Sequence, residues 1–322
     1  MIVIAKRVGR LANRMLLFAH FIGAAVEHGF TVANPAFGPN HARYFPSTAR
    51  DLLCRFPQRR LPVFPGGRVL AYGTARTADD VLYSLQRRGL DIGLIRLRRD
   101  QHIDLNSEAF LEVVRRHRVV LVHDWFFRNA ENVARHRTVI RAYFTPWEHH
   151  LTRARRAVER ARRGERLVVG VHIRQGDYRR FKDGRFLYTH EQYRRVMASV
   201  ESEFPGSEIT FLVCSDAPVP KDCFGTLDVA FGPGQEVEDL YALAHCDRII
   251  GPPSTYSRWA SFWGSVPLFV IADPDVPVAA DAFHVGWGLD WGREAAGWLA
   301  TSVSAREAAR REPAGALSPG EG

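Results

Sequence analysis

The chain has 322 residues, of which 46% are hydrophobic and 11% aromatic, so a disordered chain is excluded and two α/β domains, each with its own core, can be built. The formal net charge is +9, but all except three of the 44 basic residues are arginines, scattered along the chain. We therefore expect no nucleic-acid binding, which needs a concentrated basic face with aromatic residues. The positive charge instead favours small anionic substrates.

The first part of the chain predicts a βαβ unit. A strand over residues 2–5 leads through a glycine-containing turn into a helix over 11–28, which a glycine ends before a second strand over 30–33. Proline, glycine and arginine dominate from Asn34 to Gly67, so we expect a long irregular excursion there. Residues 119–123 predict a late strand of the same sheet.

The second part predicts alternating strands and helices. An arginine-rich helical stretch from Pro146 to Arg166 marks the boundary before it. The expected elements are strand 167–173, helix 190–203, strand 208–214, strand 227–231, helix 236–245, strand 247–251, helix 254–264 and strand 266–271. This alternation indicates a parallel, doubly wound sheet.

Four cysteines, Cys54, Cys214, Cys223 and Cys246, form neither a C-x-x-C pair nor a zinc-like spacing with histidine. We expect buried apolar residues or free thiols, and no structural metal. The first residues lack the features of a signal peptide, and no stretch approaches the roughly 18 uninterrupted apolar residues of a spanning helix. We expect a cytoplasmic protein, and peripheral membrane contact to reach a lipid-borne substrate stays open.

The most informative segment runs from Val168 to Tyr178. A β-branched strand, typical of a buried parallel sheet, delivers His172, Arg174 and Asp177 into a turn at its carboxyl end. Ligands of parallel sheets bind just beyond the carboxyl ends of the strands, so these residues predict an anion site. The alternative is a capped strand end in which the arginine pairs with the aspartate.

A second segment with anion-binding potential runs from Glu238 to Ala260. Ser254 or Thr255 stands at the start of its last predicted helix, after two prolines that end the strand. Free N–H groups and the helix dipole attract phosphate at such a position, although an ordinary N-cap has the same sequence. A P-loop, a G-x-S-x-G motif and an H-E-x-x-H motif are absent from the sequence, which disfavours ATP-driven phosphoryl transfer and the common hydrolases.

Three motifs together resemble one enzyme superfamily. His172-Ile-Arg-Gln-Gly-Asp-Tyr178 is similar to the His-x-Arg-Arg-x-Asp-Tyr motif of the α1,2-fucosyltransferases and their α1,6- and protein O-fucosyltransferase relatives. Gly9-Arg-Leu-Ala-Asn-Arg-Met15 resembles the N-terminal Gly-x-x-Asn-Gln loop of these enzymes, and Asp239 through Trp259 resembles their closing segment. The middle of the first half, where acceptors are chosen, has no recognisable match.

The resemblance implies a GT-B architecture, in which two Rossmann-like domains with parallel sheets face each other across a cleft. Residues 1–150 would then form the acceptor-side domain, 151–166 a connecting helix, 167–299 the nucleotide-sugar-binding domain and 300–322 a loose tail. The implied activity is an inverting, metal-independent transfer of fucose or a related sugar from a GDP-sugar to an acceptor hydroxyl, for example of a glycan. No cofactor and no metal are expected beyond the GDP-sugar donor.

The resemblance also implies roles for individual residues. His172 and Asp239 would recognise guanine and its surroundings, the aspartate as an acceptor for the N1–H and N2–H donors of the base. Arg174 would bind the β-phosphate and neutralise the charge that develops on departing GDP, since its planar fork suits phosphate oxygens.

Four further residues would complete the donor site. Ser254 and Thr255 would add phosphate contacts, and Asn13 with Arg10 would approach from the opposite domain on closure. The general base stays undecided, because Asp177, Asp183 and Glu191 all follow the arginine motif closely. Asp177 is the first choice, but a structural pairing with Arg174 is equally consistent with its position.

One position departs from the family pattern, because Gln175 stands where many relatives have a second arginine. Arg14, Arg179 or Arg180 would then replace the charge, or the donor would be held more weakly, or the donor sugar would differ from fucose. Two other functions stay open: a non-catalytic GDP-sugar or glycan-binding pseudoenzyme, and a GT-B transferase that uses another nucleotide sugar.

Overall fold

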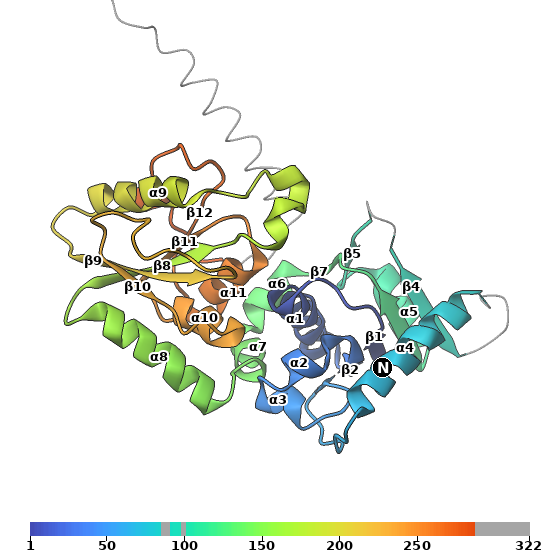
Figure 1. Ribbon diagram of the computed structural model, residues 1–322. Coiled ribbons are helices and arrows are strands. Elements are labelled where there is room, and N and C mark those ends of the chain that lie inside the picture. The colour runs from blue at the N-terminus through green and yellow to red at the C-terminus, as the bar shows by residue number, and fades with distance from the viewer. Residues whose placement is uncertain (85–90, 98–100, 287–322) are drawn as a thin grey trace, which may run out of the picture.

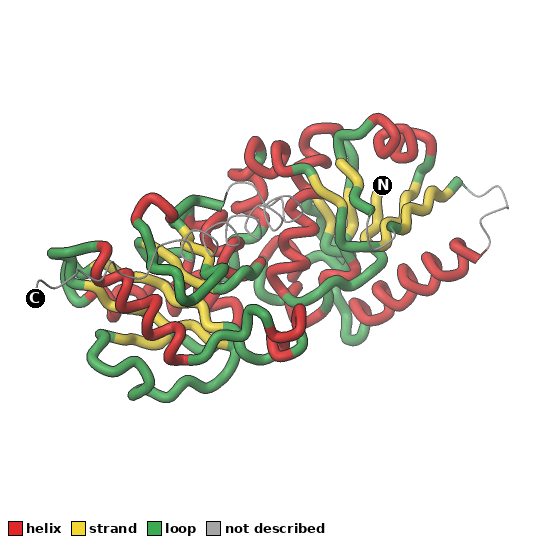
Figure 2. Tube along the Cα trace, turned by 90° about the horizontal axis from the view of Figure 1, so that it is seen from above, coloured by secondary structure: helices red, strands yellow, loops and turns green. Residues whose placement is uncertain are grey.

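The computed structural model describes residues 1–84, 91–97 and 101–286, and the predicted tail at 300–322 lies outside these ranges. Two α/β lobes, one from each half of the chain, lie side by side (Figures 1 and 2). The first half contains β1 (Ile2–Ile4), α1 (Leu11–His28), β2 (Val32–Ala33), α2 (Pro39–Ala42), α3 (Pro46–Ala49), β3 (Arg55–Phe56), α4 (Gly67–Ser84), β4 (Ile92–Arg96), β5 (Ile103–Asp104), α5 (Glu108–Arg116), β6 (Val119–His123), β7 (Phe127–Arg128), α6 (Ala130–Arg135) and α7 (Arg137–Tyr143). The second half contains α8 (Glu148–Arg162), β8 (Leu167–Ile173), α9 (His190–Glu203), β9 (Ile209–Ser215), β10 (Val229–Phe231), α10 (Glu236–Leu243), β11 (Arg248–Gly251), α11 (Thr255–Gly264) and β12 (Leu268–Val270).

The N-terminal sheet has the strand order β3-β2-β1-β6-β4. Its pairs are parallel, as expected of a Rossmann-like domain, except for the antiparallel edge pair β2–β3. The antiparallel strand β3, with α2 and α3, forms part of the segment that was expected to be irregular throughout. β6, the predicted late strand, lies directly beside β1.

Helix α1 has the bounds that the sequence predicts. Its apolar side chains pack on the N-terminal sheet, and 13 of its 18 residues are buried. Gly29 ends the helix with a φ of 72°, and its N–H donates to the carbonyl of Ala25. A left-handed conformation of this kind favours glycine, which explains why the helix stops there.

The C-terminal sheet is parallel throughout, with the order β10-β9-β8-β11-β12. The structure confirms the eight predicted elements of this half, with ends that differ by at most two residues. The chain leaves β8 first toward β9 and later returns to β11 on the other side. This reversal between β8 and β11 is the topological switch point at which doubly wound sheets bind ligands.

The two lobes share one apolar core, so the expectation of a separate core for each domain is wrong. A continuous cluster of buried residues joins α1 and the N-terminal sheet to α8, α10 and α11. Phe144 lies at the junction, where its ring meets the ring of the buried Trp259 edge to face at 5.1 Å. A second cluster lies between α9 and the other face of the C-terminal sheet.

Helix α8 was expected to be a connector between the domains, but it also packs against the C-terminal sheet. It begins at Glu148 rather than 151, and it contacts α10 and the strands β8 and β9. Within the described ranges, no helix is long and apolar enough to cross a membrane. All four cysteines are free thiols, three of them buried.

Candidate active site

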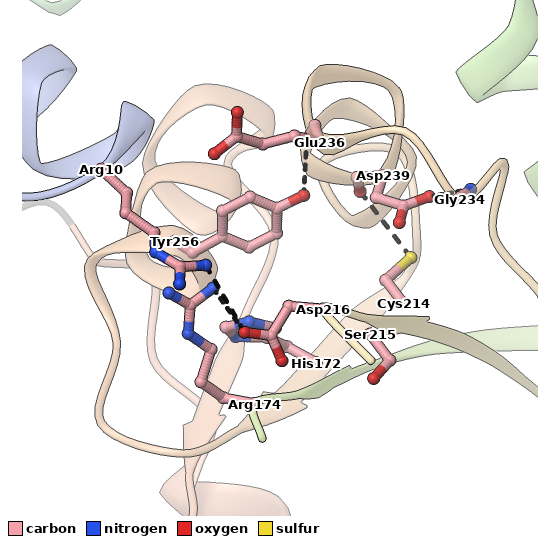
Figure 3. Close-up of a pocket in the computed structure, with 10 residues that line it drawn as sticks. All are labelled: Arg10, His172, Arg174, Cys214, Ser215, Asp216, Gly234, Glu236, Asp239 and Tyr256. Atoms are coloured by element: carbon pink, nitrogen blue, oxygen red, sulfur yellow. Dashed lines mark hydrogen bonds and ion pairs between the residues drawn. The ribbon is translucent and has the colours of Figure 1, made fainter. Parts of the chain in front are cut away.

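A cavity of about 380 Å³ opens at the carboxyl edge of the C-terminal sheet. It lies beyond the ends of β8 and β9, beside the first turns of α10 and α11 (Figure 3). Its lining residues are Arg10, His172, Arg174, Cys214, Ser215, Asp216, Gly234, Glu236, Asp239 and Tyr256. All of them except Arg10 come from the C-terminal half, and the cavity occupies the switch-point edge where a ligand is expected.

Two arginines and two aspartates form an ion-pair network beside this cavity. Arg174 contacts Asp177 Oδ1 through Nη2 at 2.8 Å and Asp216 Oδ2 through Nη1 at 3.3 Å. Arg10 reaches the same two carboxylates, with Nε 3.5 Å from Asp177 Oδ2 and Nη1 3.6 Å from Asp216 Oδ2. The aspartates therefore hold two guanidinium groups from opposite lobes next to each other, and Figure 3 shows both groups beside Asp216.

Asp216 is a site residue that the sequence interpretation missed. Its Oδ1 accepts hydrogen bonds from the backbone N–H groups of Gln175 at 2.8 Å and Gly176 at 3.3 Å, which fixes the loop after β8. The residue directly follows β9, the strand that pairs with β8. A polar residue after a second strand of the same sheet was the available signal, because parallel strands end at one common edge.

The turn before α1 brings Arg10 to the cavity. Gly9 has a φ of 48°, and a Cβ there would lie only 1.8 Å from Nδ2 of Asn13, so only glycine fits. Asn13 Oδ1 in turn accepts the hydroxyl hydrogen bond of Thr255 at the start of α11. Closure was expected to bring Arg10 and Asn13 to the other domain, but both already contact it in this structure.

His172 is the last polar residue of β8 and lines the cavity as a neutral imidazole. Burial, and then the Arg174 charge, lower the pKa of His172 to about 3. Its ring lies 4.8 Å from that of Tyr256, and its buried Nδ1 has no hydrogen-bond partner within the described part of the chain. A buried nitrogen without a partner is costly, so a bound ligand that hydrogen-bonds it gains affinity.

Two carboxyl groups of α10, those of Asp239 and Glu236, also line the cavity. Asp239 Oδ1 accepts the N–H of Gly234 at 2.8 Å, and burial raises the pKa of Asp239 to about 7. Glu236 was not among the site residues predicted from the sequence. Burial raises the pKa of Glu236, and the charges of Arg10 and Arg174 act in the opposite direction. A polar first residue of a helix that follows a sheet strand is the signal that would have found it.

Ser254 and Thr255 lie behind the cavity rather than on its lining. Ser254 caps α11 by accepting the N–H of Tyr256 at 3.2 Å, and the hydroxyl of Thr255 is bonded to Asn13. The predicted site residues therefore divide into two groups. Arg10, His172, Arg174 and Asp239 line the cavity, Asp177 pairs with the arginines, and Asn13, Ser254 and Thr255 join the lobes and cap the helix.

Two further candidates from the sequence, Gln175 and Arg14, do not line the cavity. Gln175 donates its side-chain N–H to the carbonyl of Tyr188 at 2.8 Å. Arg14 is bonded to the carbonyls of Gly9 and Phe37, so it supports the turn. Arg10, which was not among the residues considered as a replacement, supplies the second positive charge beside Arg174.

Two aromatic residues of the motif segments, Tyr178 and Trp259, are both buried. The hydroxyl of Tyr178 donates to the carbonyl of Pro253 at 2.6 Å, and Trp259 packs in the shared core. Among the residues that the structure describes, no group of three or more His, Cys, Asp or Glu side chains is arranged to hold a metal ion.

No protein-family model matches this sequence, and no curated protein matches it. Its fold is nevertheless similar to solved structures. FUT1 of Arabidopsis thaliana, in complex with GDP, has a TM-score of 0.57 at 12% identity, over 84% of this chain and 70% of that chain. Fucosyltransferase NodZ from Bradyrhizobium has a TM-score of 0.51 at 16% identity, over 86% of this chain and 97% of that chain.

This chain has a GT-B fold. Its two Rossmann-like lobes are built around the two five-stranded sheets described above. The carboxyl edges of these sheets meet where Arg10 contacts Asp177 and Asp216. The cavity therefore lies where the two lobes of the GT-B fold face each other.

Proposed function

We propose that the protein is a glycosyltransferase that moves fucose, or a related sugar, from a GDP-sugar to an acceptor hydroxyl. The observation that carries the proposal is the pair formed by Arg10 and Arg174, which project from opposite lobes to one edge of a cavity that also holds a buried carboxyl group, Asp239. Two guanidinium groups suit a diphosphate, and a carboxylate suits the N1–H and N2–H donors of guanine.

The donor assignment has two kinds of support. The three sequence motifs resemble those of enzymes that use GDP-fucose, and four cavity-lining residues, Arg10, His172, Arg174 and Asp239, come from these motifs. Among proteins of similar fold, the α1,6-fucosyltransferase NodZ was co-crystallized with GDP and soaked with GDP-fucose. His172 fits the same ligand as a neutral hydrogen-bonding group, because its pKa of about 3 leaves it uncharged at neutral pH.

The proposed reaction is a direct, inverting displacement. The acceptor oxygen forms a bond to the anomeric carbon while the bond from that carbon to the β-phosphate oxygen breaks, and GDP leaves with the bonding electrons. Arg174 and Arg10 neutralise the charge that grows on the departing diphosphate, and such preorganised donors contribute most where charge develops. This arrangement predicts transfer that needs no divalent metal.

Asp177 has a different part in this reaction from the general base of the first interpretation. Both of its carboxylate oxygens face arginines, Oδ1 toward Arg174 and Oδ2 toward Arg10. If this carboxylate took up the proton of the acceptor, both of its ion pairs would weaken. The two arginines would then be held less firmly at the moment when charge develops on the leaving GDP. We assign Asp177 to the orientation of the two guanidinium groups, which is the alternative that the sequence left open.

A calorimetric titration with GDP, UDP, ADP and GMP in the presence of EDTA tests the donor class. We expect binding that prefers GDP over UDP and that weakens strongly when the β-phosphate is missing. Absence of binding to all four nucleotides would contradict the proposal, and so would strict dependence on added manganese.

Turnover distinguishes an enzyme from a binding protein. GDP release from GDP-fucose is measured with a panel of methyl β-galactosides and methyl β-N-acetylglucosaminides as acceptors, with NMR detection of the anomeric configuration of the product. We expect acceptor-dependent GDP release and an inverted anomeric centre. GDP binding without turnover on any of these acceptors would instead indicate a pseudoenzyme.

A further inference from the structure

A second polar cluster lies at the carboxyl edge of the N-terminal sheet, outside the cavity described above. Asp79 of α4 is fully buried, although almost all other residues of this helix are at least partly exposed. Its Oδ2 contacts Nδ1 of His123 at 2.5 Å and Nη2 of Arg96 at 2.7 Å. His123 ends β6 and Arg96 ends β4, two neighbouring parallel strands.

The carboxylate determines which nitrogen of His123 carries the proton. An ionised aspartate only accepts hydrogen bonds, so Nδ1 must be the N–H donor and Nε2 of the neutral ring holds a lone pair. No hydrogen bond of Nε2 is found in the described ranges, and the His123 side chain is partly exposed, at 12%. Arg96 forms an ion pair with the buried carboxylate.

The position of His123 connects this cluster to the donor site. The backbone N–H of Ala5 donates to the carbonyl of Val122, so the chain after β1 runs beside His123. Lys6 lies 3.5 Å from Asp124, the next residue after His123. Arg10 follows Lys6 by four residues, a span of at most roughly 14 Å. The two carboxyl edges are thus joined by one short segment.

We propose that His123 is the general base of the transfer reaction and that Asp79 is its positioning residue. The inference rests on the proposed function, because it assigns the acceptor side of that same reaction. His123 Nε2 takes the proton from the acceptor hydroxyl, the acceptor oxygen bonds to the anomeric carbon, and the bond to the β-phosphate oxygen breaks as GDP leaves. The imidazolium that forms is stabilised by the Asp79 carboxylate, and it later returns the proton to water.

The two lobes then divide the work of the reaction. The C-terminal lobe, with Arg10, stabilises the leaving group, and the N-terminal lobe activates the nucleophile. Asp177 is less suited to the second task because both of its oxygens face guanidinium groups. In the His123–Asp79 pair, Nε2 of His123 is the nitrogen needed for proton uptake. It has no protein partner among the residues described.

The first test is independent of turnover. Nitrogen-15 NMR of the histidine side chains in the whole protein reports which ring nitrogen carries the proton. We expect the Nδ1–H form for His123 in the wild-type protein and loss of that form in Asp79→Asn, whose amide can donate to Nδ1. An Nε2–H form in the wild-type protein would overturn the assignment, whatever the nucleotide titration shows.

The second test is kinetic and uses GDP-fucose with the methyl glycoside that the acceptor panel selects. His123→Ala should lower kcat by about 10²–10³-fold, within the range of a lost general base, and leave the GDP affinity within about twofold. Free imidazole should restore part of kcat, which a purely structural role would not allow. Asp79→Asn should lower kcat more than it changes KM.

His117 provides a matched control. It follows the last residue of α5, two positions before β6 begins, and it also faces an aspartate, with Nδ1 4.0 Å from Oδ1 of Asp91. His117→Ala should keep the wild-type kcat. Transfer by wild-type protein and equal transfer by His123→Ala would overturn only the inference about the base. Failure of the wild-type protein to bind GDP would overturn the proposed function instead.

Discussion

The carboxyl edges of the two sheets were assembled from the sequence in different ways. At the C-terminal edge, His172, Arg174 and Asp177 come from one turn of six residues. At the N-terminal edge, Asp79 and His123 are 44 residues apart and meet only because α4 packs across the sheet. The first edge was therefore visible as a motif, whereas the second had no local signal. The difference explains why the residues of the C-terminal edge were predicted from the sequence and those of the N-terminal edge were not.

The largest effect on activity is expected when the positive charge of Arg174 is removed from the C-terminal edge. Arg174→Ala should lower kcat by about 10²–10³-fold, as for other donors that stabilise a developing anion. Arg174→Lys should recover little, because an ammonium group cannot contact Asp177 and Asp216 with a planar fork. Steady-state kinetics with GDP-fucose measure both variants. Arg194→Ala, an exposed arginine of α9 paired with Glu191, is the control, and full activity of Arg174→Ala would contradict the mechanism.

The next prediction concerns the turn of the N-terminal lobe that positions Arg10 at the cavity. Gly9→Ala places a Cβ in the space of Asn13 at a positive φ, and should cost about 1–3 kcal/mol in the free energy of unfolding. It should also weaken GDP binding, since Asn13 and Arg10 move together with the turn. Denaturant unfolding and calorimetry measure the two effects. Gly29→Ala is the control: its φ is also positive, but nothing lies within 4 Å, so it should cost stability without loss of GDP affinity.

The pH dependence of GDP binding tests the far side of the cavity. The pKa of Asp239 is raised to about 7, so the group is mostly protonated below that pH and must lose its proton to accept hydrogen bonds from guanine. GDP affinity should therefore rise with pH and fall by about tenfold for each unit below 7. Calorimetry between pH 5.5 and 8, spanning roughly one unit or more on each side of that value, measures the slope.

Asp239→Ala is the matching variant. It should weaken GDP binding more than inorganic pyrophosphate binding and remove the pH slope that comes from this carboxyl group. Equal losses for the two ligands would assign Asp239 to structure rather than to base recognition.

The smallest effect concerns the position that departs from the family pattern. Gln175 bonds to the carbonyl of Tyr188 and contributes no charge to the cavity. Gln175→Ala should lower the free energy of unfolding by about 1 kcal/mol and change GDP affinity by less than about twofold. A tenfold loss of GDP affinity would show that this side chain contacts the nucleotide, contrary to its position in the structure.

Much of the fold could be read directly from the sequence. Periodic apolar residues and a terminal glycine located α1, and the alternation of strands and helices located every element of the C-terminal sheet. The N-terminal half was harder, because β2 and β3 have two residues each and such strands carry no periodic signal. The antiparallel edge and the helices α2 and α3 depend on contacts with the rest of this lobe.

The candidate site shows the same limit residue by residue. Arg174 and His172 were found because a buried strand leads directly to them. Asp216 and Glu236 were missed because each is a single acidic residue after a different strand, without a motif around it. Their roles become clear only when the sheet brings the strand ends together.

Local sequence determined most of the elements, the positive charge and several of the cavity-lining residues, because apolar periodicity and turn chemistry act over a few neighbouring positions. The tertiary structure decided that Arg10 stands beside Arg174, that the two lobes share one core, and that Asp79 orients His123. These arrangements depend on packing between segments far apart in the chain. Such packing is selected by the shape and burial of whole surfaces, which no short stretch of sequence contains.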